Sequence, residues 1–134
     1  NFFVSRAEAG EELTVYEPGT QSRNFVHVKD IAEAYIRSCE QLLDALERGE
    51  TGATAYEIAG DEDPSVMKVA EMVQRIAGEE LGTDIPVTLV ENPRSAETLV
   101  EDFTVDTAKA ARELGWEPQR TVEESIRELL ARRE

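Results

Sequence analysis

Short β-rich runs alternate with helix-patterned segments along the whole sequence, and this alternation restricts the fold more than any other feature. Extended structure is predicted where β-branched and aromatic residues gather, at 13–16, 24–28, 54–60, 85–91 and 102–106. The apolar spacing between these runs predicts helices. Because strands and helices interleave, the sequence predicts an α/β or α+β fold with small mixed sheets and packed helices. The 134 residues suffice for a single domain over 1–134.

Two predicted helices have a recognisable start and an apolar side. One begins at Asp30, where an aspartate followed three residues later by Glu33 forms a capping-box pattern, and it ends near Gly49. Its predicted core-facing stripe is Ile31, Tyr35, Cys39, Leu42 and Leu46. Cys39 is therefore interpreted as a small core residue without a disulfide partner. The other helix lies within 63–82, and its predicted stripe is Val66, Val69, Val73 and Ile76.

Acidic residues outnumber basic ones by 29 to 14, which gives a formal net charge of −15. Such a surface repels nucleic acids and anionic lipids, so neither is expected as a partner. With only three lysines, the composition favours adaptation to a salt-rich cytosol; an ordinary acidic, arginine-rich protein is the alternative. No long apolar run and no basic-then-apolar leader occur, so we expect a cytoplasmic protein and no membrane partner. Asn1 opens directly into a helical segment, which suggests a piece of a longer protein.

The residues needed for common active sites are scarce in this sequence. Gly49 and Gly52 follow a helix and precede a strand, the reverse of the order in a dinucleotide-binding turn. One histidine and one cysteine cannot form a zinc site. His27 lies in an alternating apolar stretch, which favours a hydrogen-bonded structural imidazole over a catalytic base. We therefore predict no catalytic, cofactor-binding or metal-binding residue in this chain.

Four stretches resemble one enzyme family in the order in which that family carries them. EELTVYEPGTQSRNFVHVKDIAEAY, at 11–35, resembles the C-terminal half of the extended short-chain dehydrogenase/reductases. Within that family, the resemblance is to the NAD-dependent nucleotide-sugar epimerases and dehydratases of the UDP-glucose 4-epimerase type. AYEIAG at 55–60, VMKVAEMVQRIAG at 66–78 and VDTAKAARELGWEPQRTVEESI at 105–126 are similar to later segments of the same family. The resemblance covers essentially the whole chain.

The resemblance implies a substrate site. It places Arg23 on the diphosphate of a nucleotide-sugar, with Arg94 as a second arginine, and it places the strand at 13–16 against the nucleotide base. A guanidinium binds phosphate oxygens through two parallel hydrogen bonds and stays charged at any accessible pH. Surface salt bridges are the alternative for the two arginines. The predicted base contacts are Leu13, Val15 and Tyr16, for which plain strand core is the alternative.

The same resemblance implies that the reaction needs a part outside this chain. In the family, NAD is bound by an N-terminal Rossmann domain that also carries a Tyr-x-x-x-Lys pair, and no tyrosine here has a lysine four residues on. The chain is thus expected to be the substrate-binding part of an epimerase and inactive alone. A 4,6-dehydratase and a non-catalytic binding module are the alternatives. The helix from Asp30 and the strand near 55–59 would be left uncovered, so a homo-oligomer or another chain partner is expected there.

Overall fold

The computed structural model describes residues 1–93, 100 and 102–131. The chain forms two compact units. The first unit comprises Asn1–Arg23, Asp63–Phe103 and Val122–Glu134, and the second comprises Asn24–Glu62 and Thr104–Thr121. Helices and a small sheet occur together, which confirms the predicted fold class.

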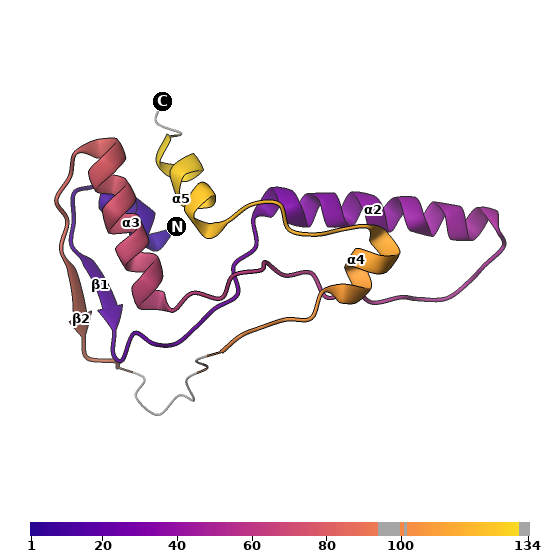
Figure 1. Cartoon of the computed structure of the whole chain (residues 1–134), viewed down its shortest axis with the longest axis horizontal. Coiled ribbons are helices and arrows are strands. Elements are labelled where there is room, and N and C mark those ends of the chain that lie inside the picture. Colours follow the sequence, from indigo (N-terminus) through magenta and orange to yellow (C-terminus); the bar gives the residue numbers. More distant parts are fainter. Residues whose placement is uncertain (94–99, 101, 132–134) are drawn as a thin grey trace. The chain divides into compact units, whose positions relative to one another are not determined.

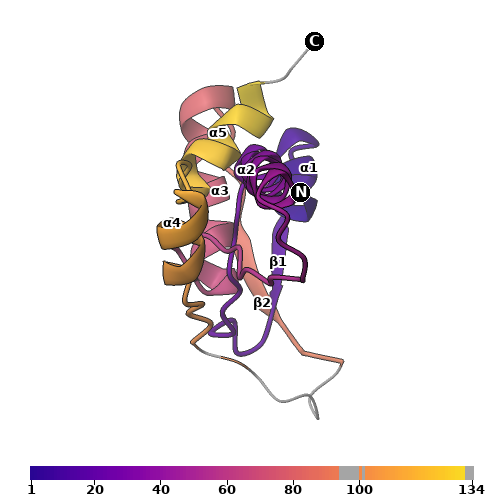
Figure 2. The same ribbon diagram turned by 90° about the vertical axis from the view of Figure 1, so that its right-hand side faces the viewer.

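The first unit contains the sheet. Its elements are α1 (Phe2–Glu8), β1 (Leu13–Tyr16), α3 (Val66–Leu81), β2 (Val87–Val90) and α5 (Val122–Ala131). The two strands are parallel, and their register pairs Leu13 with Val87 and Tyr16 with Val90. Figures 1 and 2 both show them side by side and running in the same direction. The strands predicted at 13–16 and 85–91 are therefore confirmed.

Aliphatic side chains form the core of the first unit. On α3 the predicted stripe is confirmed, because Val69, Val73 and Ile76 are buried while Val66 is half-buried. This core cluster contains residues from α1, α3 and α5, from β1 and from the segment just before β2. Its members are Val4, Ala7, Leu13, Val73, Ile76, Ala77, Ile85, Val122, Ile126 and Leu130. This apolar burial is the main force that holds the first unit together.

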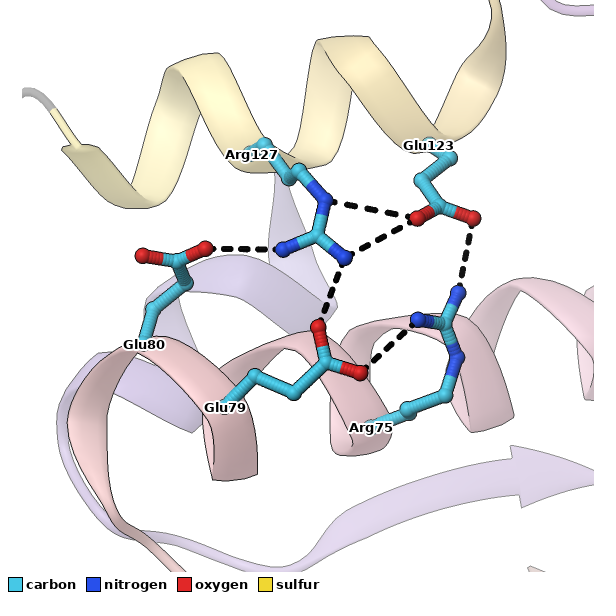
Figure 3. Close-up of polar contacts among 5 residues, drawn as sticks. All are labelled: Arg75, Glu79, Glu80, Glu123 and Arg127. Atoms are coloured by element: carbon cyan, nitrogen blue, oxygen red, sulfur yellow. Dashed lines mark hydrogen bonds and ion pairs between the residues drawn. The ribbon is translucent and has the colours of Figure 1, made fainter.

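An ion-pair network joins α3 and α5 on the surface of the first unit (Figure 3). Arg127 contacts Glu79 at 2.6 Å, Glu80 at 2.7 Å and Glu123 at 3.0 Å. Arg75 contacts Glu79 at 3.0 Å and Glu123 at 2.7 Å. Hydrogen bonds from these arginines lower the pKa of Glu79 and of Glu123. The largest contribution comes from Arg127 for Glu79 and from Arg75 for Glu123.

The second unit is built on α2 (Val28–Glu47) and α4 (Ala108–Leu114). The expectation that Asp30 caps α2 is wrong, because the cap is His27, whose Nδ1 accepts a hydrogen bond from the Lys29 amide at 3.1 Å. The structural interpretation of His27 is thereby confirmed. Asp30 is instead buried in the first turn of α2, where its carboxylate accepts hydrogen bonds from residues 119 and 120.

Asp30 is the polar centre of the second unit. Its Oδ2 accepts the backbone amides of Gln119 at 3.0 Å and Arg120 at 3.1 Å, and its Oδ1 accepts the guanidinium of Arg120. The indole of Trp116 donates to the backbone oxygen of Asp30 at 2.8 Å. Trp116 also packs in a small cluster with Ala34, Ala110 and Leu114. Three bonds to one carboxylate and one to its backbone therefore fasten the 116–120 segment to the start of α2.

Four of the five residues in the apolar stripe predicted to face the core on α2 are exposed, and Ile31 is half-buried. The exposed fractions are 70% for Tyr35, 55% for Leu42 and 56% for Leu46, and Cys39 is exposed as well. The buried side of α2 carries Asp30 and Ala34, because small and polar groups there meet Trp116 and its neighbours. The core assignment of Cys39 is wrong for this reason.

Three other β-rich runs do not form strands among the described residues. Residues 24–27, 54–60 and 102–106 are extended or irregular, Val28 begins α2, and a single bridge pairs Phe25 with Glu62. The Asn24 side chain instead bonds the backbone of Gly60 twice, at 2.8 and 2.9 Å. A Cβ atom at Gly60 would lie 1.8 Å from the Phe25 carbonyl oxygen, so only glycine permits this approach.

Candidate functional site

The loop at 17–23 follows β1 at the carboxyl edge of the parallel sheet (Figure 1). Ligands of open α/β sheets bind outside the carboxyl ends of parallel strands, so this edge is where a site is expected. Gly19 lies in this loop with φ +76°, and an added Cβ would be 3.3 Å from side chains of Leu89, Met67 and Val15. The glycine allows the loop to pack tightly over the strand ends.

The loop is fastened to the N-terminus of α3. The amide of Val66 donates to the Gln21 oxygen at 2.9 Å, and that of Met67 donates to the Gly19 oxygen at 3.1 Å. The next amide, of Lys68, donates to the side chain of Ser65 at 3.2 Å. Because these donors are already bonded, the start of α3 is not open to an anion. A phosphate at this edge would have to be bound by a side chain.

Arg23 ends this loop and supplies such a side chain. It is exposed, and its Nη1 donates to the neighbouring Ser22 oxygen at 2.9 Å. Within the described part of the chain, Arg23 forms no ion pair, whereas arginines such as Arg37, Arg48 and Arg75 pair with carboxylates. The alternative of a surface salt bridge therefore finds no support among the described residues. Its role toward a ligand stays a prediction.

Gln21 lies two residues before Arg23 and is a residue that the sequence did not single out. Its side chain is only 9% exposed, and its Nε2 reaches the Tyr16 oxygen at 3.5 Å. Its Oε1 is buried and has no hydrogen-bond partner in the described structure. Its burial accompanies the bonds between the loop and α3, and these bonds involve residues distant in sequence.

The remaining predicted site residues differ in where they lie. Leu13 and Val15 are buried in the first unit, so the strand-core alternative describes their side chains. Tyr16 ends β1 and is 53% exposed. Arg94 lies outside the described residues, so its pairing with Arg23 stays a prediction.

Two other classes of site were searched for in the described residues. No group of three or more histidine, cysteine, aspartate or glutamate side chains there is placed to hold a metal ion. Among the helices of the described residues, none is long and apolar enough to cross a membrane.

Comparison with protein families gives one match over nearly the whole chain. The family model described as GDP-mannose 4,6 dehydratase matches residues 2–129. UDP-glucose 4-epimerase of Bacillus subtilis (strain 168) is 31% identical over 130 residues, which cover 91% of this chain and 35% of that protein. UDP-glucuronic acid decarboxylase 6 of Arabidopsis thaliana is 30% identical over 128 residues, which cover 92% of this chain and 32% of that protein.

Solved structures show the same fold. UDP-glucose 4-epimerase of Thermotoga maritima, solved with UDP-glucose, superposes with a TM-score of 0.73 at 22% identity, covering 97% of this chain and 37% of that one. The UDP-glucose 4-epimerase of Bifidobacterium longum, in complex with NAD+ and UDP, gives a TM-score of 0.72 at 22% identity, covering 97% and 38%. The chain thus spans about a third of the length of the relatives that it matches.

Proposed function

The chain belongs to the GDP-mannose 4,6-dehydratase family, a family of NAD-dependent nucleotide-sugar epimerases, dehydratases and decarboxylases, and we propose that it is the nucleotide-sugar-binding part of an epimerase of the UDP-glucose 4-epimerase type. The observation that carries this proposal is Arg23, an exposed arginine without an ion pair in the described chain, at the carboxyl edge of the β1–β2 sheet. A 4,6-dehydratase that uses the same binding part is the alternative.

Arg23 would bind the diphosphate of the substrate. Its planar guanidinium offers two parallel N–H donors to phosphate oxygens, and it does so on a chain whose net charge of −15 otherwise repels an anion. Arg94 is proposed as the second arginine of the same clamp. By holding the diphosphate, these residues would fix the sugar at one distance and angle from the reacting groups.

We assign the NAD site to a part of the protein outside this chain. The sequence has no strand followed by a glycine-rich turn and a helix, the arrangement that lets a pyrophosphate approach a helix N-terminus. Bound there, NAD would supply the hydride-transfer chemistry toward the sugar. The residues of this chain contribute binding and orientation.

The exposed side of α2 supports the proposal of a further domain. Its exposed apolar residues are Val28, Tyr35, Ile36, Leu42, Leu43 and Leu46. A continuous apolar side on a helix of 20 residues is typical of an interface. We propose that the NAD-binding domain covers it, since about two thirds of each relative's length lies outside the matched segment. A second copy of the chain is the alternative occupant.

The chain alone is predicted to have no epimerase or dehydratase activity. It lacks the Tyr-x-x-x-Lys pair and the glycine-rich turn by which, according to the resemblance, the family transfers the proton and binds NAD. The measurement is turnover of UDP-glucose and dTDP-glucose by the purified 134-residue chain with added NAD. Formation of UDP-galactose or of a 4-keto sugar by this chain would contradict the assignment.

The binding role is tested by Arg23→Ala in the full-length protein. Charge-assisted hydrogen bonds contribute about 1.5 to 3 kcal/mol each, so affinity for UDP or dTDP should fall about ten- to a hundredfold by calorimetry. Arg23→Lys should recover part of the loss, because an ammonium lacks the planar fork. If Arg94 binds the same diphosphate, the double variant Arg23→Ala/Arg94→Ala should be non-additive.

Arg48→Ala is the matched control for this test. Arg48 is exposed and pairs with Glu50, so its removal changes the net charge equally without touching the carboxyl edge of the sheet. It should leave the nucleotide affinity unchanged. Unchanged affinity in Arg23→Ala together with a lower melting temperature would assign Arg23 a structural role.

A further inference from the structure

The side chain of Gln21 is held in one orientation. Its backbone oxygen accepts the Val66 amide at 2.9 Å, and the following residue, Ser22, donates its amide to the Val100 oxygen at 2.7 Å. The backbone on both sides of the side chain is therefore fixed. The amide orientation is assigned from the Nε2 contact with the Tyr16 oxygen at 3.5 Å, since the reverse orientation would set two oxygens against each other.

This orientation leaves a buried acceptor without a donor in the described part of the chain. A buried polar atom without a partner destabilises the folded state, and an apolar side chain of similar length would avoid that loss. Methionine would fill the same space. The contact with the Tyr16 oxygen accounts for the amide nitrogen of Gln21, whereas nothing in the described packing of the loop accounts for its oxygen.

We propose that Gln21 Oε1 accepts a hydrogen bond from the nucleoside part of the ligand whose diphosphate Arg23 binds. This inference rests on the proposed function. The oxygen cannot pair with the diphosphate, whose oxygens are themselves acceptors. The nucleoside offers the donors that it needs, namely ribose hydroxyls and a ring N–H. Arg23 and Gln21 would thereby recognise two different chemical groups of one ligand from adjacent positions of one loop.

Burial of the oxygen adds a condition. Oε1 is covered in the ligand-free chain, whereas the Arg23 side chain two positions later is exposed. The ligand must move covering side chains aside before the bond to Gln21 can form. Arg23 can therefore bind the diphosphate first, and the nucleoside engages Gln21 second.

The test uses Gln21→Met in the full-length protein, with UDP, dTDP and inorganic pyrophosphate as calorimetric probes. Loss of one hydrogen bond predicts a fall in UDP or dTDP affinity of about three- to tenfold. Pyrophosphate has no nucleoside, so its affinity should stay unchanged, whereas Arg23→Ala should weaken all three probes. The melting temperature without ligand should change little, because methionine removes both the unpartnered oxygen and the long Nε2 contact with the Tyr16 oxygen. Gln21→Leu carries the same expectation if Gln21→Met does not fold.

Thr83→Val is the matched control. Thr83 Oγ1 is the other buried side-chain atom without a hydrogen-bond partner in the described residues, and it lies in the same unit, just after α3. Its replacement by the isosteric valine should leave the affinity for all three probes unchanged.

The outcomes separate this inference from the function on which it rests. If the wild-type protein binds neither UDP nor dTDP, the proposed function fails and the inference fails with it. If it binds them and Gln21→Met binds them equally well, only the inference is wrong. An equal loss for nucleotide and pyrophosphate would also overturn it, because Gln21 would then act by holding the loop that carries Arg23.

Discussion

The two units are stabilised by different kinds of interaction. In the first unit, aliphatic side chains from three helices and the sheet region form one buried cluster. In the second unit the buried cluster contains only Ala34, Ala110, Leu114 and Trp116, and directional hydrogen bonds to Asp30 join segments far apart in sequence. Apolar packing tolerates substitutions of similar volume, whereas a buried carboxylate with three donors tolerates almost none. Sensitivity to substitution should therefore differ between the units.

The largest effect is expected from Asp30→Ala in the second unit. It removes the acceptor of two backbone amides and of the Arg120 guanidinium, and leaves those donors without their partner. The free energy of unfolding should fall by about 2 to 4 kcal/mol. Hydrogen-exchange measurements should show that the Gln119 and Arg120 amides exchange faster in the variant than in the wild type. The lower melting temperature of the variant should report the loss of stability.

Two further variants test whether the two units differ in their sensitivity to substitution. Asp30→Asn keeps one oxygen as an acceptor and should lose less than Asp30→Ala. Ile76→Val removes one methyl group from the apolar core of the first unit and should lower the free energy of unfolding by about 0.5 to 1.5 kcal/mol. If Asp30→Ala lost no more than Ile76→Val, the buried carboxylate would not be the main polar support of the second unit.

A smaller effect is expected from salt, and it acts on the whole chain. With a net charge of −15, carboxylates repel one another, and potassium chloride at molar concentration screens this repulsion. Screening also weakens the α3–α5 ion pairs, but exposed pairs contribute little. The melting temperature should therefore rise by several degrees between low and molar salt. A flat or falling melting temperature would count against adaptation to a salt-rich cytosol.

The smallest effect is expected from Glu123→Gln, which removes the carboxylate shared by Arg75 and Arg127. The hydrogen bond from Arg75 and then that from Arg127 lower the pKa of Glu123 in the folded state. Its contribution to stability is therefore present above the unfolded pKa, about 4.3, and is lost as the pH falls through the lower folded pKa. The wild type should melt at most a few degrees above the variant at pH 7, and this difference should shrink as the pH falls below the unfolded pKa.

Glu71→Gln serves as the control for the pH series. Glu71 is an exposed glutamate on α3 outside the network, and its replacement makes the same change in net charge. Its melting temperature should follow the wild type at every pH. A difference between wild type and Glu123→Gln that stays constant as the pH falls through the acid range would show that the network does not act through its ionised carboxylates.

The parts of the fold that could be predicted are those specified by neighbouring residues. The run at 13–16 and the stripe Val69, Val73 and Ile76 show their periodicity within a few residues, and both are confirmed. Asp30 was misassigned as a cap because aspartate there, with Glu33, fits the local pattern. Its actual partners, Gln119 and Arg120, are 89 and 90 residues away, and no local pattern carries that information.

The other wrong predictions also depend on contacts with residues that are distant in sequence. The run at 54–60 has the composition of a strand, but a strand also needs a neighbouring strand, and none pairs with it among the described residues. The stripe on α2 was predicted to face a core because amphipathic spacing does not say what covers the apolar side. At the candidate site, the resemblance pointed to Arg23, while Gln21 was missed because its burial comes from the contact between loop and α3.

The close approach of Gly60 to Phe25 also restricts which sequences can adopt this arrangement. A methyl group at position 60 would overlap a backbone oxygen, which cannot move aside as a flexible side chain can. Relatives that keep this approach must keep a glycine there, whatever sugar they bind. A retained glycine at this position would therefore be a sign of shared backbone geometry, and any library of variants in the second unit should leave it fixed.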